Sequence, residues 1–294
     1  MDDRGGDRPQ IRNGQDLHDC DRSAQGSGCR EEGGSRARNS QETEEDRNVG
    51  KPRVKGIGAC ESGSDKSYTE KEYHKKKKKL QKKIRKLHGE LYRRQIPVII
   101  GFEGWDAGGK GGAIKRLTEK MDPRGFTVNT TAAPNDYEKA HHYLWRFWKN
   151  VPKKGHVAVY DRTWYGRVMV ERIEGFCTKK EWQRAFKEIN DMEAQFVQSG
   201  AIVLKFWMQI DKEEQRKRFE ERQKNPKKQW KITEEDWRNR DKWDAYEEAV
   251  NEMLIRTSTP EAPWVIVEGN CKYYARIKVL EAVIEAIEKR LESR

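Results

Sequence analysis

Short apolar runs alternate with helical patterns along most of the chain after residue 66. Five runs rich in β-branched and aromatic residues have the length of strands, at 98–100, 126–131, 157–160, 202–208 and 264–267. Helices are expected between and around them, at 68–94, 143–148, 182–197, 211–222 and 273–291. Strands that alternate with helices predict an α/β fold with a parallel sheet, helices on both of its faces, and functional groups at the carboxyl ends of the strands.

The first 66 residues have a different composition. They contain no Phe, Tyr or Trp and few aliphatic residues, while Gly, Ser, Asp, Glu and Arg are abundant. Such a segment cannot bury enough apolar surface to offset the entropy of the chain. The sequence therefore predicts a disordered leader over 1–66, followed by one domain over 67–294.

A glycine-rich segment follows the first predicted strand and reads VIIGFEGWDAGGKGGAIK over 98–115. Gly104, Gly109 and Lys110 have the spacing of a GxxxxGK loop, whose backbone N–H groups surround phosphate oxygens at the start of a helix. Gly111 stands where such loops carry a metal-binding Ser or Thr. Asp106 lies inside the loop, and a carboxylate there would repel a phosphate unless Mg²⁺ or Mn²⁺ lay between them. The alternative is a flexible glycine turn with an exposed lysine.

A second group of charged residues follows the third predicted strand, which ends at Asp161. Phosphate-binding α/β folds hold their metal ion with an aspartate in this place. Arg162 and Arg167 follow, with Glu171 shortly after them, and arginines beside a carboxylate can clamp the oxygens of a phosphoryl group. The alternative is an aspartate at a strand end that forms only a surface salt bridge.

The segment 223–244, called the lid segment below, combines a helix break with many charges. Asn225-Pro226 should end the preceding helix, which carries Arg222, and Thr233 should cap a new one. Its basic residues could close over bound phosphates and exclude water. They are Lys227, Lys228, Lys231, Arg238 and Arg240. The alternative is a charged helical hairpin with no such role.

Composition narrows the class of protein. No apolar run approaches the roughly 20 residues that cross a bilayer, and the start lacks the apolar stretch of a signal peptide, so we expect a cytoplasmic protein that does not enter a membrane. Its five cysteines are scattered with no CxxC pair, which predicts reduced thiols and no zinc.

The net charge of +12 indicates an anionic partner. Residues 71–96 hold twelve basic and two acidic residues, either as a solvated helix face or as a platform for a long polyanion.

Together, the motifs GWDAGGKGG, YDRTWYGRVMVER, EGFC, KFW and KQWKITEEDWRNRDKWDAY resemble those of polyphosphate kinases of the second type, from about residue 68 to the C-terminus. The resemblance implies a P-loop core like that of thymidylate kinase with a helical lid. It also implies transfer of the terminal phosphoryl group of inorganic polyphosphate to a nucleotide, dependence on Mg²⁺ or Mn²⁺, and assembly as a homodimer or homotetramer.

The same resemblance implies roles for single residues. The implied metal ligands are Asp106 and Asp161. The implied phosphate-binding residues include Lys110, Arg162 and Arg222, and Glu171 is placed near the acceptor. The stretches HHYLWRFW, WYGRVMVER and NDMEAQF are most similar to the polyphosphate:AMP phosphotransferase branch, which makes ADP. Members of that branch often carry two fused copies of the domain whereas this chain has one, and ADP or GDP remains an alternative acceptor.

Two other functions fit parts of the sequence. An ATP-dependent nucleoside monophosphate kinase would share the loop and the Asp-Arg pair, although its single ATP would not require so cationic a surface. A nucleic-acid-binding protein would suit the charge and the ten tryptophans. Most of these tryptophans lie in apolar helix or strand patterns, which favours core packing, and nucleic acid is not expected as a partner.

Overall fold

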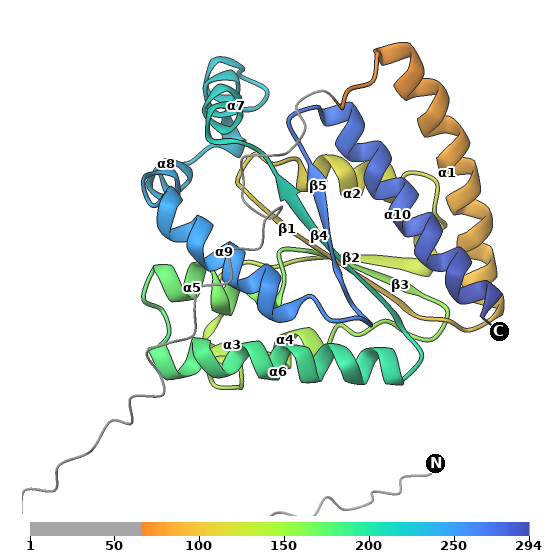
Figure 1. The fold of residues 1–294 in the computed structure, drawn as a ribbon, viewed down its shortest axis with the longest axis horizontal. Helices are drawn as coiled ribbons and strands as arrows, with labels where there is room; N and C mark the ends of the chain where they lie inside the picture. The colour runs from red at the N-terminus through yellow and green to blue at the C-terminus, as the bar shows by residue number, and fades with distance from the viewer. Residues whose placement is uncertain (1–65, 294) are drawn as a thin grey trace, which may run out of the picture. The chain divides into compact units, whose positions relative to one another are not determined.

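The computed structural model describes residues 66–293, and there five parallel strands form one sheet in the order β2-β3-β1-β4-β5 (Figure 1). The strands are β1 Val98–Gly104, β2 Phe126–Thr130, β3 Val157–Asp161, β4 Ile202–Gln209 and β5 Trp264–Glu268. All five predicted strands are confirmed. The central strand β1 pairs with β3 and with β4, so Phe102 lies beside Asp161 and Gly104 lies beside Met208. The register therefore places the end of β3 next to the glycine-rich loop.

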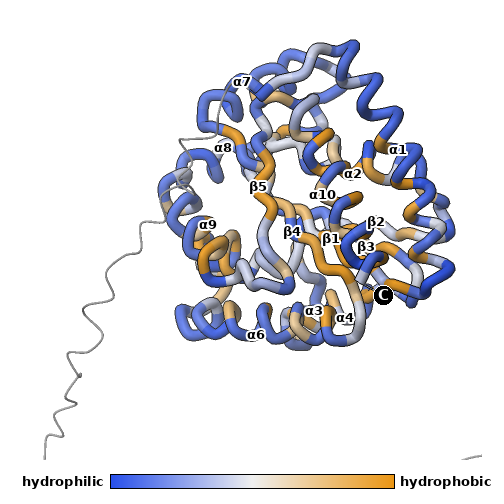
Figure 2. Tube along the Cα trace, turned by 45° about the vertical axis from the view of Figure 1, so that its right-hand side comes forward, coloured by the Kyte–Doolittle hydropathy of each residue, from blue (hydrophilic) through white to orange (hydrophobic). Residues whose placement is uncertain are grey.

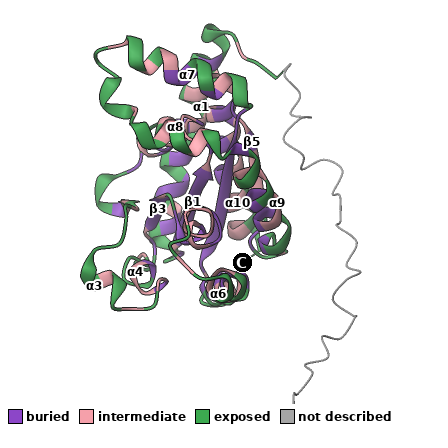
Figure 3. Cartoon of the chain, turned by 90° about the vertical axis from the view of Figure 1, so that its left-hand side faces the viewer, coloured by how far each residue is buried: buried purple, intermediate pink, exposed green. Residues whose placement is uncertain are grey.

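Two helical layers cover the sheet, as predicted (Figure 1). One layer contains α1 Glu70–Arg93, α2 Lys110–Thr118 and α10 Lys272–Glu292. The other contains α6 Lys179–Gln198 and α9 Trp243–Thr257. Alternate residues of β1 serve the two cores, since Val98, Ile100 and Phe102 pack in the first and Ile99 in the second. Figure 2 shows hydrophobic strands in the centre, and Figure 3 shows the inner strands β1 and β3 as buried.

The helices begin where the sequence supplies capping residues. Thr69 with Glu72 and Thr178 with Glu181 form capping boxes at α1 and α6. α7 Lys212–Lys224 ends before Asn225, as predicted, and α8 Glu234–Asp241 begins after Thr233. The shorter elements are η2 Pro123–Gly125, α3 Asp136–Lys139, α4 Trp145–Trp148, η3 Trp164–Val168, α5 Val170–Ile173 and η4 Gln229–Lys231.

One predicted helix is wrong in length. The aromatic segment 143–148 forms only the single turn α4, in which Phe147 is buried and Trp148 is exposed. Its apolar residues do not recur beyond one turn, and Pro152 follows, so no longer face could be buried.

The predicted leader over 1–66 lies outside the described residues, apart from Lys66. Of the five cysteines, the described part of the chain includes two, Cys177 and Cys271, which are not in a disulfide. No helix among residues 66–293 has the length and apolar character needed to cross a bilayer.

Candidate phosphate-binding site

The loop between β1 and α2 depends on glycines at two positions. Gly104 has a φ of 143°, and a Cβ atom there would lie 2.5 Å from the carbonyl oxygen of Met208. Gly109 has a φ of 108° and is the N-cap residue of α2. Larger residues would be strained or would clash at these positions. The Lys110 Nζ donates to the carbonyl oxygens of Gly104 at 2.6 Å and Trp105 at 3.2 Å, which holds the ammonium group across the loop.

One carboxylate, Asp106, lies within this loop, and a second, Asp161, lies close to it. Asp106 accepts hydrogen bonds from Arg162 Nη2 and from Asn239 Nδ2 of α8, both at 3.2 Å. Asp161 Oδ2 would lie 3.9 Å from a Cβ atom at Gly111. Because Gly111 has no side chain, the start of α2 is open towards Asp161.

The donor set suits a cation that is also bound by substrate. Among residues 66–293, no group of three or more His, Cys, Asp or Glu side chains could hold a metal ion by itself. Mg²⁺ is commonly bound by one or two carboxylates together with substrate phosphates. Asp106 and Asp161 could therefore hold a metal ion whose remaining ligands come from phosphate oxygens and water.

Arg162 has an unusual backbone conformation, with a φ of 66°. Its N–H donates to the carbonyl oxygen of Phe102 at 3.1 Å, and its carbonyl oxygen accepts from Thr131 Oγ1 at 2.8 Å. A non-glycine residue in this region costs about 1–2 kcal/mol. The turn directs the Arg162 side chain back towards Asp106. Burial lowers the pKa of Arg162, but Asp106 and nearby carboxylates outweigh this and raise the pKa overall.

A buried carboxylate also stabilises the turn at Arg162. Glu103 of β1 accepts from the Thr163 backbone N–H at 2.6 Å and from Thr163 Oγ1 at 2.8 Å. Burial raises the pKa of Glu103, although the charge of Lys110 opposes the shift. These bonds fix the residue that follows Arg162.

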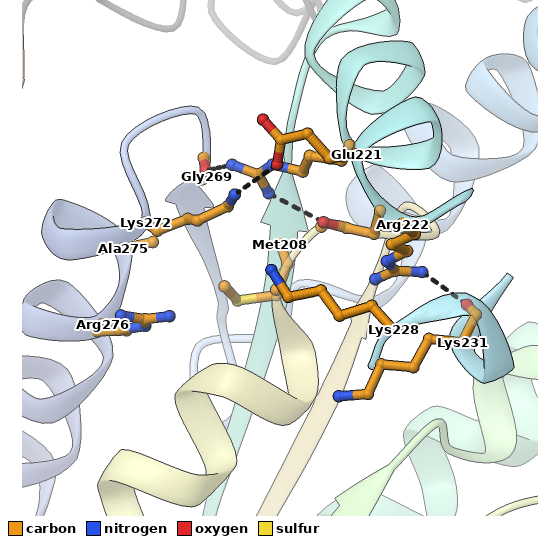
Figure 4. A pocket seen from close by; sticks show the side chains of 13 residues that line it. Met208, Glu221, Arg222, Lys228, Lys231, Gly269, Lys272, Ala275 and Arg276 are labelled. Carbon is orange, nitrogen blue, oxygen red and sulfur yellow. Dashed lines mark hydrogen bonds and ion pairs between the residues drawn. The ribbon is translucent and has the colours of Figure 1, made fainter. Parts of the chain in front are cut away.

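A cavity of about 230 Å³ lies beside the loop, between the end of β4, α7, the lid segment and the start of α10. Among the described residues that line it, Glu221 alone is acidic, and it lies 3.7 Å from Lys272. The basic lining residues are Arg218, Arg222, Lys228, Lys231, Lys272 and Arg276. Figure 4 shows Lys228 and Lys231 extending towards the wall formed by Lys272 and Arg276. The cavity is thus strongly cationic and suits a polyanion.

The two arginines of α7 that line the cavity act differently. Arg218 is buried and donates to the carbonyl oxygens of Ala107 at 2.9 Å and Gly269 at 2.7 Å, so it braces the loop. Arg222 donates to the Lys231 carbonyl oxygen at 2.9 Å, and burial lowers its pKa. Burial also lowers the pKa of Lys272, and the charge of Arg218 adds to this effect.

An aromatic stack joins the loop to the residues after α8. The ring of Trp105 lies 3.7 Å from that of Trp243, the first residue of α9, with 8° between the planes. The Trp105 Nε1 donates to Gln209 Oε1 at 3.0 Å. The loop and the end of the lid segment are therefore packed against each other.

Comparison with known proteins gives the family. The family described as Polyphosphate kinase 2 (PPK2) matches residues 67–294. The chain belongs to the polyphosphate kinase 2 family.

Named relatives of the family have similar sequences. The Polyphosphate:AMP phosphotransferase of Pseudomonas aeruginosa is 55% identical over 195 residues, which are 66% of this chain and 39% of the relative. That of Acinetobacter johnsonii is 53% identical over 190 residues, 65% of this chain and 40% of the relative. The chain thus spans about two fifths of the length of these relatives. The ADP-polyphosphate phosphotransferase of P. aeruginosa is 38% identical over 212 residues, 72% of this chain and 70% of the relative.

Solved structures of the family have the same fold. A putative polyphosphate kinase 2 from P. aeruginosa matches with a TM-score of 0.75 and 49% identity, covering 78% of this chain and 50% of the other. Polyphosphate kinase 2 from Arthrobacter aurescens matches with a TM-score of 0.74 and 32% identity, covering 78% and 83%. The predicted α/β P-loop kinase fold is confirmed.

The structure gathers most of the sequence-predicted site residues of this PPK2 domain. Around the loop it brings together Gly104, Asp106, Gly109, Lys110, Gly111, Asp161 and Arg162. Arg222, Lys228 and Lys231 line the cavity, whereas Lys227 does not. Arg167 and Glu171 also lie outside the cavity lining and form a 3.0 Å ion pair, with Arg167 over the ring of Tyr143. Burial raises the pKa of Glu171, against the opposing effect of Arg167.

Three basic cavity residues, Arg218, Lys272 and Arg276, were not predicted as site residues from the sequence. Arg218 lies in α7, and the other two lie in the first turns of α10, directly after β5. In a parallel sheet the carboxyl ends of all strands share one edge, so basic residues after the last strand were a usable signal. Asn239 was also missed, since only the position of α8 shows its contact with Asp106.

Proposed function

We propose that this protein transfers the terminal phosphoryl group of inorganic polyphosphate to a nucleotide, with AMP as the principal acceptor and ADP as the product. The observation that carries the proposal is the cavity beside the glycine-rich loop, whose lining has six basic side chains and one acidic side chain. These side chains supply more positive charge than is needed to bind the phosphates of one nucleoside triphosphate.

Each part of the site has a role in this reaction. Lys110 and the loop amides bind the donor, and Arg222, Lys228, Lys231, Lys272 and Arg276 hold the chain behind it. Arg162 stabilises charge on the transferred group, which passes through a loose transition state. An acceptor phosphate is already ionised, so no general base is required.

A divalent cation, Mg²⁺ or Mn²⁺, belongs to this proposal. When bound, it would neutralise charge on the donor and acceptor phosphates. Asp106 and Asp161 would hold it. The contact of Asn239 with Asp106 would position that carboxylate when the lid segment lies over the loop and excludes water.

The choice of acceptor rests on the relatives. Those named as AMP phosphotransferases are 52–55% identical to this chain, and that named as an ADP-polyphosphate phosphotransferase of P. aeruginosa is 38% identical. ADP or GDP as acceptor is the alternative. We place the activity in the cytoplasm and expect a dimer or tetramer, in keeping with the family that the motifs resemble.

The test is nucleotide formation by the purified protein with Mg²⁺, long-chain polyphosphate and either AMP or ADP, without ATP. ADP formed from AMP supports the proposal. ATP formed only from ADP would move the acceptor to the diphosphate. If polyphosphate gives no product with either acceptor, and ATP with AMP gives ADP, the donor is ATP and not polyphosphate. Reactions without polyphosphate and with excess EDTA are the controls.

A further inference from the structure

The outward face of α1 carries a series of exposed basic side chains. Lys71, Lys75, Lys78, Lys82 and Arg85 follow one another at steps of four and three residues, which places them in one row along the helix. Lys79 and Lys86 lie beside this row. All seven are exposed, and none forms an ion pair with any residue between 66 and 293. We call these seven residues the α1 basic row; at 1.5 Å per residue it is about 22 Å long.

The row is not needed to dock α1 on the domain. Buried Ile84, Leu87 and Leu91 pack α1 on the core. Other lysines of the helix pair with α10, Lys76 with Glu281 and Lys83 with Glu288, both at 2.8 Å. Like charges at these spacings destabilise a helix. Repulsion within the row therefore destabilises α1 until a bound anion neutralises the charge of the row.

The first turns of α1, where the row begins, lie close to the cavity. The helices α1 and α10 run side by side (Figure 1). At their first turns Tyr73 stacks on Tyr273, with 4.4 Å between ring centroids. The Arg276 guanidinium, which lines the cavity, and the Lys77 ammonium each lie 5.9 Å from the ring of Tyr73. A polyanion leaving the cavity past Arg276 therefore reaches the first turns of α1 on the side of Tyr73 and Lys77, where Lys77 lies 3.6 Å from Glu119. The α1 basic row begins on the outer side of the same turns.

We propose that the α1 basic row binds the part of a long polyphosphate chain that extends beyond the cavity. The inference rests on the proposed function and adds a second site for the same donor. A linear polyanion matches a straight row of charges, and a cavity of about 230 Å³ holds only a short stretch of such a chain.

Other polyanionic partners fit the row less well. The apolar side chains Ile84, Leu87 and Leu91 of α1 are buried in the domain core. Tyr92 is the one exposed large apolar side chain of this helix among the described residues, so α1 has little to insert into a membrane surface. Exposed aromatic side chains on which nucleic acid bases could stack are few on α1: among the described residues they are His74 beside the row and Tyr92 beyond its end. Polyphosphate needs neither.

The experiment compares two variants with equal loss of charge. The test variant carries Lys75→Gln, Lys78→Gln and Lys82→Gln. The control variant carries Lys179→Gln, Lys180→Gln and Lys187→Gln, three exposed lysines of α6, which covers the other face of the sheet. Initial rates are measured with tripolyphosphate and with long-chain polyphosphate as donors, at saturating acceptor and several salt concentrations.

We expect the test variant to raise the KM for long-chain polyphosphate several-fold, with unchanged kcat and unchanged KM for tripolyphosphate. The slope of log KM against log salt should fall by about 2, because each lost contact of a single-stranded polyanion removes about 0.7. The control variant should behave as the wild type. Equal changes with both donors, or no change, would overturn the proposal.

A binding measurement separates this inference from the proposed function. Anisotropy of labelled long-chain polyphosphate needs no catalysis, so weaker binding by the test variant supports the row even if the wild type forms no nucleotide. Loss of single-stranded DNA binding with unchanged affinity for long-chain polyphosphate would assign the row to nucleic acid and overturn the proposal.

Discussion

Asp106→Asn tests the centre of the site because it removes a negative charge and keeps the shape of the side chain. In the structure the two carboxylate oxygens accept from Arg162 and Asn239, each at 3.2 Å. An amide offers one oxygen, so one contact is lost. The lost charge matters more, since Asp106 is one of two carboxylates proposed to face the metal ion.

The size of the effect differs between activity and stability. Loss of one electrostatic contact to a transition state typically reduces kcat by about 10²–10³, which is about 2.7–4 kcal/mol. The Asp106–Arg162 pair is partly exposed, with 56% of the arginine side chain accessible, so its loss should cost about 1 kcal/mol of folding stability or less. Asp106→Asn should therefore be nearly inactive and yet folded.

The assay is the initial rate of ADP formation from AMP and long-chain polyphosphate across a Mg²⁺ titration, with thermal unfolding measured in parallel. Asp136→Asn is the matched control, because the side chain of Asp136 is fully exposed and, within residues 66–293, pairs only with Lys139. Retention of more than about a tenth of the activity at saturating Mg²⁺ would refute the reasoning, since the expected loss is at least 10². A loss of stability as large as the loss of activity would refute it as well.

Two further predictions concern folding stability. Gly104→Ala should lower the free energy of unfolding by about 3 kcal/mol, because its Cβ would lie 2.5 Å from the carbonyl oxygen of Met208. Gly89→Ala on α1 should raise the free energy of unfolding by about 0.5–1 kcal/mol, because its Cβ would meet open space. Equal changes for the two variants in urea unfolding would contradict this prediction. Because burial raises the pKa of Glu103 above 4.5, its contribution to stability is complete below pH 4.5 and is lost as pH rises through the folded pKa. Glu103→Gln keeps an acceptor for Thr163 but cannot titrate. The free energy of unfolding of the wild type minus that of the variant should therefore fall as the pH rises above 4.5. A difference that stays constant with pH would disprove the raised pKa.

The fold could be read from the sequence because its signals are local. The central strands β1, β3 and β4 are buried on both faces and appear as apolar runs, and residues such as Asp211 and Thr233 mark helix starts. The segment 143–148 was misjudged because a cluster of aromatic residues resembles a helix face even when only one turn packs. Local patterns show that a segment is apolar, but tertiary contacts decide how far it remains helical.

The parts of the candidate site that could be predicted are those whose residues share one motif or lie on adjacent strands. Asp106 and Lys110 share one loop, and β1 pairs with β3 so that Asp161 must lie nearby. Arg276 is far away in sequence and enters the cavity only because β5 joins the same sheet. The spacing of four residues between Arg218 and Arg222 indicates a shared helix face, but it does not show that only the first braces the loop.

The stacked pair of Trp105 and Trp243 gives the protein an optical probe of its own. One indole lies within the loop expected to bind phosphate, and the other lies where the lid segment meets α9. Rings this close and this parallel couple electronically, so their near-ultraviolet circular dichroism and their fluorescence depend on their separation. Motion of the lid segment against the loop can therefore be followed by spectroscopy, without a label and without turnover.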